Sequence, residues 1–165
     1  ISHDMPDSSS LRFSTFLEMY KNKGSSVFLA LNVKSDGLQV PLKRALDEYN
    51  ISNYFIFDMS VPDHFTSLKS GFKTFTRVSE IEPSPTLLEE SEGLWLDQFL
   101  GDWIDSKTIK KYMDIGKKVC IVSPELHNRD KRFSWSEYKK LPSKYLDELM
   151  LCTDYPMEAK AFFND

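Results

Sequence analysis

Residues 26–34 read Ser-Val-Phe-Leu-Ala-Leu-Asn-Val-Lys and are followed by Ser-Asp-Gly at 35–37. A short apolar run that stops at polar and turn-forming residues is typical of a strand buried on both faces of a sheet. Residues 39–49 then place apolar side chains at helical spacing: Val40, Leu42, Ala45, Leu46 and Tyr49. A strand followed by a helix is therefore the first structural unit that the sequence predicts.

The same alternation continues to the end of the chain. Further strands are predicted at 54–59, 74–78, 93–99, 118–122 and 149–153. Helices are predicted after Pro62, at 106–115 with Gly116 ending it, near 136–141 and at 156–163. Strands that alternate with helices indicate a parallel sheet with right-handed crossovers.

An open, doubly wound sheet and a closed (β/α) barrel both fit this alternation. No glycine-rich nucleotide-binding signature follows any of the strands, which disfavours the common open sheets. Polar residues end nearly every strand: Lys34, Asp58, Arg77, Glu80, Asp97, Glu125 and Asp154. In a barrel these ends meet at one mouth, where barrel enzymes act. We therefore expect an α/β fold of the TIM barrel type, formed by residues 1–165 as one domain. The chain would supply about six of the eight βα units, and an upstream segment the other two.

The composition narrows the classes of partner. The chain has 165 residues, 41% of them hydrophobic and 28% charged, and a formal net charge of -4. Its lysines are scattered rather than clustered, which disfavours nucleic acid as a partner. No apolar run approaches the ~20 residues of a transmembrane helix. Cys120 and Cys152 lie far apart in apolar runs, so we expect buried free thiols and a cytoplasmic location.

Asn32 and Lys34 point to the same side of their strand, because alternate residues of a strand share a face. The Lys34 ammonium suits a phosphate or carboxylate, although a lysine at a barrel rim can also simply extend into water. Asn32 is expected deeper in the strand. Its carbonyl oxygen can bind a hard cation, or its amide can hydrogen-bond neighbouring side chains.

Arg77 and Glu125 are two further candidates for substrate binding. Arg77 ends a strand, where it can bind a phosphate through two hydrogen bonds or pair with Glu80 or Glu82. Glu125, with His127, follows an apolar strand and can bind substrate hydroxyls. Alternatively, Glu125 pairs with Arg129 in a polar connecting loop.

Most aromatic residues, and His64, are predicted to have structural roles; Trp95 is the exception. Trp95 lies on a strand that ends in Asp97, and an inward-facing ring there would form a wall of the substrate pocket. The phenylalanines of the strands and helices are predicted core residues. His64, at the start of a helix, is expected to face solvent.

Three short motifs in order along the chain resemble those of a known family. They are His3-Asp4-Met5-Pro6, Leu31-Asn32-Val33-Lys34 and Cys152-Thr153-Asp154-Tyr155-Pro156. This set resembles the glycerophosphodiester phosphodiesterase family, which shares its barrel superfamily with the phosphatidylinositol-specific phospholipases C. The resemblance implies metal-assisted hydrolysis of a small or lipid-derived glycerophosphodiester.

The resemblance also implies roles for individual residues. His3 would be the general acid that protonates the leaving alkoxide, and Lys34 would help to hold the phosphate. A divalent cation, Mg or Ca, would offset the charge of the phosphoryl oxygens. Asn32 stands where the family has a glutamate metal ligand, so metal affinity should fall unless another carboxylate, such as Asp58 or Glu125, replaces that ligand. The first catalytic histidine and two acidic ligands of the family would precede Ile1.

Two other functions use the same residues differently. A catalytically inactive barrel would bind a phosphorylated ligand through Lys34 and Arg77 without cleaving it. A Schiff-base lyase would use Lys34 as its nucleophile, which requires a depressed lysine pKa and a nearby acid or base.

Overall fold

The structure is a computed structural model that describes residues 1–2, 5–24 and 27–164. The chain divides into two compact units, residues 1–72 (unit 1) and 73–165 (unit 2), which we describe separately. The prediction that residues 1–165 form one domain therefore stays a prediction. Every strand pair in either unit is parallel, so the chain is confirmed as α/β.

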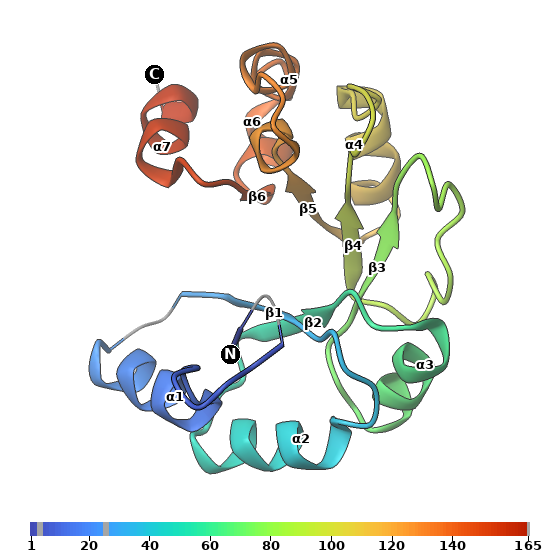
Figure 1. The fold of residues 1–165 in the computed structure, drawn as a ribbon. Helices are drawn as coiled ribbons and strands as arrows, with labels where there is room; N and C mark the ends of the chain where they lie inside the picture. The colour runs from blue at the N-terminus through green and yellow to red at the C-terminus, as the bar shows by residue number, and fades with distance from the viewer. Residues whose placement is uncertain (3–4, 25–26, 165) are drawn as a thin grey trace. The chain divides into compact units, whose positions relative to one another are not determined.

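Unit 1 contains a two-stranded parallel sheet with helices packed against one face (Figure 1). Its elements are α1 (Phe13–Asn22), β1 (Leu29–Asn32), α2 (Gln39–Glu48), β2 (Tyr54–Phe57) and α3 (Val61–Lys69). Leu29 pairs with Tyr54 and Leu31 with Ile56, and these side chains join Leu17 and Leu46 of the helices in one apolar core. The opposite face carries Asn32, which pairs with Phe57.

Unit 2 contains a four-stranded parallel sheet whose strand order follows the chain, β3-β4-β5-β6. Its strands are β3 (Phe75–Val78), β4 (Gly93–Leu96), β5 (Lys118–Val122) and β6 (Met150–Cys152). Its helices are α4 (Ser106–Met113), the 3-10 helix η1 (Pro124–His127), α5 (Arg132–Tyr138), α6 (Ser143–Leu146) and α7 (Pro156–Asn164). Each strand thus lies beside its predecessor, without the reversal of order that defines a doubly wound sheet.

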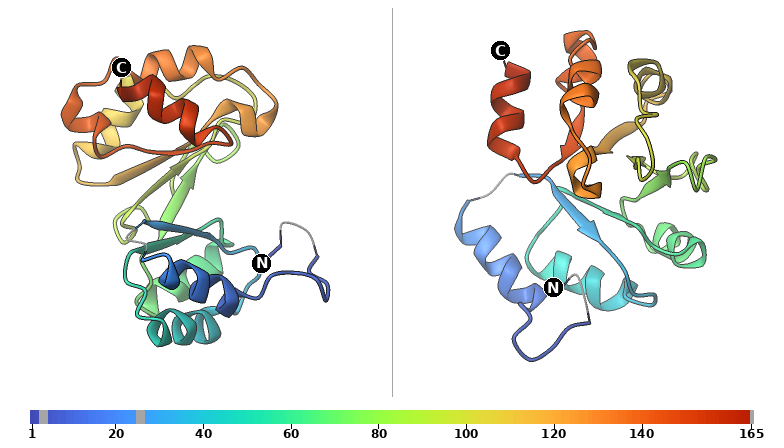
Figure 2. Two further views of the ribbon diagram at one scale, coloured as in Figure 1. Left: turned by 90° about the vertical axis from the view of Figure 1, so that its left-hand side faces the viewer. Right: turned by 45° about the horizontal axis from the view of Figure 1, so that its top comes forward.

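The helices α4 to α7 pack against a single face of the unit 2 sheet, as Figures 1 and 2 show. Val78, Leu94, Leu96 and Ile121 point to this face and form one core with side chains of all four helices, including the fully buried Trp135. Alternation along the strands places Arg77, Trp95 and Cys120, which are neighbours in the register, on the other face. Helices on one face only are typical of barrels and differ from the two-sided covering of open α/β sheets.

Local signals fix where several elements begin and end. Asp105 caps α4 by accepting the backbone N–H of Thr108 at 2.7 Å, which the free N–H groups of a first turn require. Gly116 (φ 81°) adopts a left-handed conformation just after that helix, as predicted. At the start of β4, Gly93 accommodates the ring of Phe75, because an added Cβ would lie 2.6 Å from a ring carbon.

The six predicted strands are confirmed: β5 has the predicted bounds, and the other five are shorter than predicted. The strand predicted from 26 to 34 spans Leu29–Asn32, and that from 93 to 99 stops at Leu96. The helix expected near 136–141 begins earlier, at Arg132, while α1 and α6 were not predicted. The prediction that β1 is buried on both faces is wrong, because Ala30 and Asn32 are exposed on the face away from the helices.

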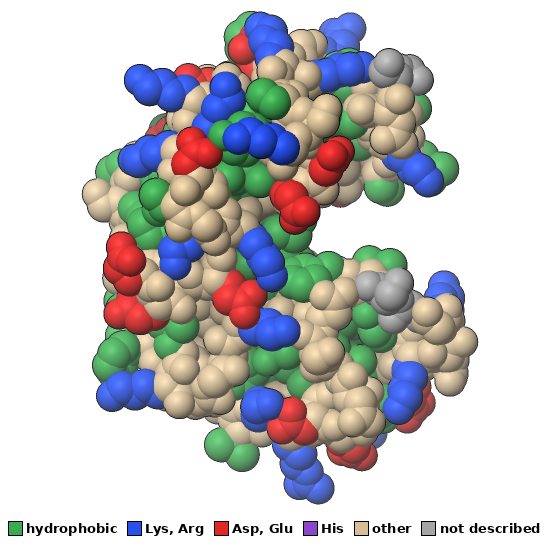
Figure 3. All heavy atoms as spheres, turned by 180° about the vertical axis from the view of Figure 1, so that it is seen from behind, with side chains coloured by type: hydrophobic (Ala, Val, Ile, Leu, Met, Phe, Trp, Pro, Cys, Tyr) green, Lys and Arg blue, Asp and Glu red, His purple; other side chains and the backbone are tan. Residues whose placement is uncertain are grey.

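Neither sheet of the described residues closes into a barrel, so the barrel itself is not confirmed. In the described part of the chain, no helix combines the length and apolar character needed to cross a membrane. The scattered charge expected from the sequence is visible in Figure 3, where basic and acidic side chains intermingle over the face shown.

Candidate functional site

Polar side chains gather at the carboxyl edge of unit 2, which we define as the ends of β3–β6 and the segments that follow them. Asp97 and Gln98 follow β4 directly, Ser123 and Glu125 follow β5, and Thr153 follows β6. Because parallel neighbouring strands end side by side, these residues come together although they are distant in the sequence. The contacts among them define the candidate site.

Asp97 and His127 form the closest pair of this edge. The Nε2 atom of His127 lies 2.6 Å from Oδ1 of Asp97, and the same oxygen accepts the backbone N–H of Gln98 at 2.9 Å. Asp97 is buried and His127 is half-buried, with its ring 4.8 Å from that of Phe99. Since a carboxylate only accepts hydrogen bonds, Nε2 carries a proton, and Nδ1 of a neutral ring is then the basic nitrogen.

Glu125 is held by hydroxyl groups from two strand ends. Its Oε2 accepts the hydroxyl of Ser123 and its Oε1 accepts that of Thr153. The indole N–H of Trp135 donates to the Ser123 hydroxyl at 2.8 Å, so the orientation of Glu125 depends on a buried core residue. Glu125 is thus fixed as an acceptor beside the ends of β5 and β6. The alternative in which it pairs with Arg129 is wrong.

Arg129 instead ties two connecting segments together. Its Nη1 donates to the backbone oxygen of Gln98 at 2.6 Å, and its Nη2 pairs with Asp102. Asp102 also accepts the Ser134 hydroxyl at 3.0 Å. These bonds link the segment after β4 to the segment after β5, which carries His127, and so stabilise the geometry of the Asp97–His127 pair.

The pKa of the Cys152 thiol reflects the burial and the negative charge at this edge of the sheet. Burial, followed by the negative charges of Asp154, Asp97 and Glu125, raises the pKa of its thiol to about 11. Three carboxylates therefore act on one half-buried position. Both cysteines are free, and Cys120 is buried, as the sequence predicted.

Arg77 and Glu80 form separate contacts at the end of β3. Arg77 pairs with Glu82, which confirms one alternative for this residue. Burial alone would raise the pKa of Glu80, but backbone N–H groups, including those of Leu100, Gly101 and Phe99, outweigh burial and lower it. These three N–H groups donate to the Glu80 carboxylate, each at 3.0 Å, which fixes the loop after β4.

Trp95 is buried, 7% exposed, in the register row between Arg77 and Cys120. It lies on the face of the sheet away from the helices, two residues before Asp97 on the same strand. The position agrees with a wall beside the candidate site, and its contact with a substrate stays a prediction.

Three predicted site residues, Asn32, Lys34 and Asp58, lie in the described part of unit 1. The structure brings Asn32 and Asp58 into contact. Asn32 donates from Nδ2 to Oδ2 of Asp58 at 3.3 Å, and Asp58 adopts a left-handed φ of 71° directly after β2. Asn32 is exposed, so the expectation that it lies deep in the strand is wrong: in the described part of unit 1, the helices pack against the other face of β1. Lys34 is exposed beyond the end of β1.

The described residues around Asn32 and Asp58 offer few ligands for a divalent cation. The Asn32 amide turns an N–H rather than a carbonyl oxygen toward Asp58, leaving one carboxylate there as a ligand. Across residues 1–2, 5–24 and 27–164, no three or more His, Cys, Asp or Glu side chains are arranged to hold a metal. The involvement of Mg or Ca stays a prediction.

The other two histidines have different outcomes. His3, the predicted general acid, lies outside the described residues. His64 is only 5% exposed, so the prediction that it faces solvent is wrong. Asp63 and Ser67 of α3 are also buried, and Asp63 accepts hydrogen bonds from Gly37, which precedes α2, and from Gln39, the first residue of α2.

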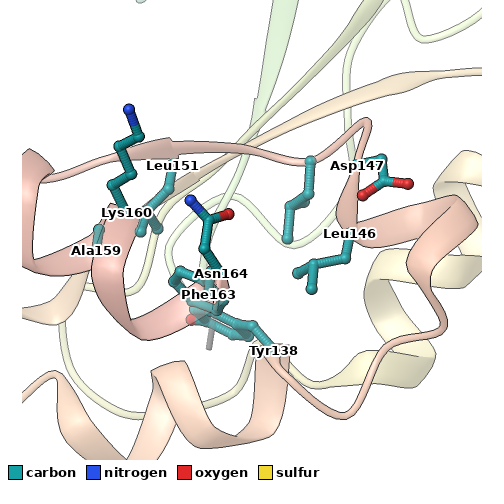
Figure 4. A pocket seen from close by; sticks show the side chains of 9 residues that line it. Tyr138, Leu146, Asp147, Leu151, Ala159, Lys160, Phe163 and Asn164 are labelled. Atoms are coloured by element: carbon teal, nitrogen blue, oxygen red, sulfur yellow. The ribbon is translucent and has the colours of Figure 1, made fainter.

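A cavity of about 380 Å³ lies elsewhere in unit 2, between α6, β6 and α7 (Figure 4). Its lining is mixed: it includes the apolar side chains of Leu146, Leu151 and Phe163, and also the polar side chains of Asp147, Lys160 and Asn164. It is lined by none of the residues of the Asp97–His127 pair or the Glu125 network. It is therefore separate from the candidate site.

The chain matches no protein-family model. It also matches none of the curated proteins with which it was compared.

Asp97 and His127 were both candidate residues in the sequence, but the contact between them was not predicted. Asp97 appeared among the polar strand ends and His127 beside Glu125. This contact could have been predicted from the order of the strands. Consecutive parallel strands are usually neighbours in a sheet, and the segments that follow them then lie close together. The strand predicted to reach Phe99 ends at Leu96, so Asp97 lies just past the strand, in the segment that meets His127.

Proposed function

We propose that this protein is a phosphoric diester hydrolase of the TIM barrel type that acts on a small or lipid-derived glycerophosphodiester. The observation that carries the proposal is the Asp97–His127 pair, 2.6 Å apart, at the carboxyl ends of parallel strands beside Glu125. Enzymes with barrel folds act at this end of their strands. The sequential strand order and the one-sided helices of unit 2 support the barrel type.

His127 is proposed to move the proton of the reaction. Asp97 holds the ring so that Nδ1 can accept a proton from the attacking water as that water bonds to phosphorus. The bond from phosphorus to the leaving alkoxide then breaks, and the alkoxide takes a proton. The resemblance assigns that donation to His3. A residue held in this way contributes about 10²–10⁴-fold to a rate.

Glu125 is proposed to bind a hydroxyl of the substrate's glycerol. Its two oxygens accept hydrogen bonds from Ser123 and Thr153 and retain lone pairs for one more donor. Lys34 remains the proposed phosphate-binding residue of the resemblance, and Arg77 and Trp95 remain proposed substrate-binding residues because of their positions on the strands. A cytoplasmic location remains part of the proposal, consistent with the two free thiols.

The test is hydrolysis of glycerophosphocholine and of bis(p-nitrophenyl) phosphate by the purified protein, with and without Mg or Ca. His127→Gln and Asp97→Asn should each lower kcat/KM by about 100-fold or more, as expected for loss of a general base or of its orientation. Asp130→Asn is the matched control, because Asp130 is an exposed residue that pairs with neighbouring Arg132. Unchanged kcat/KM in both site variants would contradict the proposal.

A second candidate function is a catalytically inactive barrel that binds a phosphorylated ligand. It is favoured by Asn32, whose amide hydrogen-bonds Asp58 and which stands where the resemblance implies a glutamate metal ligand. Binding of glycerol 3-phosphate measured by calorimetry, with no turnover of either diester, would support this function. Loss of that binding in Lys34→Ala and Arg77→Ala would assign the site.

A further inference from the structure

Glu80 is a polar residue at a strand end to which the proposed reaction gives no role. It follows β3 by two residues and is half-buried. Its carboxylate accepts three consecutive backbone N–H groups of the segment after β4, each at 3.0 Å: Phe99 on Oε2, and Leu100 and Gly101 on Oε1. Hydrogen bonds to an ionised acceptor are about twice as strong as those between neutral groups. Glu80 therefore attaches the segment after β4 firmly to the end of β3.

A hydrogen-bonded turn fixes the backbone on both sides of Glu80. The hydroxyl of Ser79, which is 2% exposed, accepts the backbone N–H of Ile81 at 3.2 Å and that of Glu82 at 3.1 Å. The backbone N–H of Ser79 in turn donates to the backbone oxygen of Glu82 at 3.0 Å. Because the Glu80 side chain starts from a fixed turn, its carboxylate can hold a neighbouring segment in one place.

The segment that Glu80 holds is also the segment that contacts His127. Asp97 lies 2.6 Å from Nε2 of His127, and the ring of Phe99 lies 4.8 Å from the imidazole ring, tilted by 55°. The two contacts come from residues only two apart in the chain. A displacement of this short segment would therefore change the orientation of the imidazole at both contacts.

The residue between these two contacts is attached in a different direction. The Gln98 side chain donates from Nε2 to the backbone oxygen of Val122 at 3.2 Å and to the Tyr138 hydroxyl at 2.8 Å. These bonds tie Gln98 to the end of β5 and to α5, whereas the next three N–H groups bond to Glu80 after β3. The part of the segment that carries the Phe99 ring therefore depends on Glu80.

We propose that Glu80 is a positioning residue for the proposed hydrolysis: it holds the segment of Asp97 and Phe99 so that the imidazole of His127 keeps one orientation. This inference rests on the proposed function, because Glu80 acts on the reaction only through His127. The contacts themselves need no substrate, so they can be tested apart from turnover.

The three backbone donors require an ionised carboxylate. Burial alone would raise the pKa of Glu80, but the backbone N–H groups outweigh burial and lower it, so the side chain is charged near neutral pH. A glutamine side chain carries one acceptor oxygen and one NH2 group, and the NH2 group would face an N–H group of the segment. Glu80→Gln therefore loosens the attachment while it preserves the volume of the side chain.

The first test is kinetic. In Glu80→Gln, kcat for bis(p-nitrophenyl) phosphate should fall about tenfold or more, because a small displacement of a catalytic group slows the reaction, while KM stays within about twofold. Glu90→Gln, the same change at an exposed residue of the same connection, should leave kcat unchanged. In a His127→Gln background, Glu80→Gln should lower kcat no further, because there is no imidazole left to position. Wild-type kcat in Glu80→Gln, or a further loss in that background, would overturn the proposal.

The second test follows the imidazole by nitrogen-15 NMR and needs no turnover. The Nε2 proton of His127, assigned with His127→Gln, should exchange with water about tenfold faster in Glu80→Gln than in the wild type, because local opening becomes easier. Glu90→Gln should exchange at the wild-type rate. Equal exchange in Glu80→Gln and the wild type would overturn the positioning role. Faster exchange in Glu80→Gln, in a protein that hydrolyses no diester, would support that role while contradicting the proposed function.

A second variant separates positioning from a general loss of stability. Phe99→Leu leaves the Glu80 carboxylate and its backbone donors in place but removes the ring beside His127. It should speed exchange of the Nε2 proton and lower kcat, as Glu80→Gln does. Phe133→Leu is the matched control, because Phe133 is 61% exposed. If Phe99→Leu keeps both the exchange rate and kcat of the wild type, the ring contact does not position His127 and the proposal is wrong.

Discussion

The carboxyl edges of unit 1 and unit 2 carry similar kinds of residues but hold them differently. In unit 1, the exposed Asn32 contacts Asp58 through a single hydrogen bond of 3.3 Å. In unit 2, Asp97 is buried against His127 and Gln98, while Glu125 joins two hydroxyl groups. A polar group becomes a precise structural feature only where neighbouring elements supply its partners. The comparison therefore favours unit 2 as the site of any chemistry that depends on a fixed geometry.

The stability of the two cores gives the largest expected effect. Ile121 is fully buried in unit 2 and Leu46 is fully buried in unit 1. Ile121→Ala should lower the free energy of unfolding of unit 2 by about 2–5 kcal/mol, and Leu46→Ala that of unit 1 by a similar amount. The three tryptophans, Trp95, Trp103 and Trp135, all belong to unit 2, so their fluorescence in urea reports on that unit.

The two units can be compared only if Ile121→Ala and Leu46→Ala change different unfolding transitions. Leu46→Ala should shift the transition followed by far-ultraviolet circular dichroism more than the transition followed by fluorescence. Equal shifts of the fluorescence midpoint by both variants would show that the two units unfold as one.

The chemistry of Cys152 tests the electrostatic character of the unit 2 edge. Burial, together with Asp154, Asp97 and Glu125, raises the pKa of its thiol from 9.0 to about 11. The thiolate is the reactive form, so iodoacetamide should modify Cys152 about 100-fold more slowly at pH 8 than a thiol with the ordinary pKa. Mass spectrometry of the native protein, compared with the protein in urea, measures this rate.

The same shift predicts how stability depends on pH. Between pH 9 and 11 the folded protein retains the Cys152 proton that the unfolded chain has lost. Its contribution to stability is therefore complete below pH 9 and disappears as the pH rises to about 11. Cys152→Ser should reduce this alkaline loss of stability in urea titrations. An unchanged dependence on pH in this variant would contradict the assignment.

The hydroxyl groups around Glu125 give the next effect. Thr153→Val removes a donor to a half-buried carboxylate and should lower the free energy of unfolding by about 1–3 kcal/mol. The matched change in unit 1, Asn32→Ala, removes one exposed hydrogen bond and should cost less than about 0.5 kcal/mol. Urea denaturation of the two variants measures the difference. If both variants lowered the free energy of unfolding equally, the carboxyl edge of unit 2 would not be more firmly held than that of unit 1.

The sequence predicted the strands better than the side-chain environments. Each strand in the described residues was predicted, because an apolar run followed by polar residues is a local signal. Helix α1 was missed, although Phe13, Phe16, Leu17 and Tyr20 recur at helical spacing. The helical spacing of these apolar residues was present in the sequence, but the mostly polar residues before and after them made it hard to recognise.

The errors about individual residues arose from tertiary contacts. His64 is buried although its position at the start of α3 predicted exposure, and its neighbour Asp63 accepts hydrogen bonds from Gly37 and Gln39, contacts that no local pattern of α3 reveals. Asn32 is exposed because the described helices of unit 1 pack against the opposite face of β1. The Asp97–His127 contact required both the pairing of β4 with β5 and the end of β4 at Leu96. Contacts of this kind depend on register and packing, which local sequence determines only weakly.

The smallest expected effect compares two turns, one in each unit. Asn50 (φ 53°) follows α2 and Asn128 (φ 57°) follows η1, and both adopt the left-handed conformation that glycine tolerates best. Asn50→Gly and Asn128→Gly should each change the free energy of unfolding by no more than a few tenths of a kcal/mol, because asparagine already tolerates this conformation. Asn128→Gly, however, alters the residue that follows His127. If the backbone here only needs the left-handed turn, kcat/KM for diester hydrolysis should stay within about twofold of the wild type while the stability is unchanged. A larger loss of kcat/KM in Asn128→Gly than in Asn50→Gly, at equal stability, would show that the rigidity of this turn helps to hold His127 against Asp97.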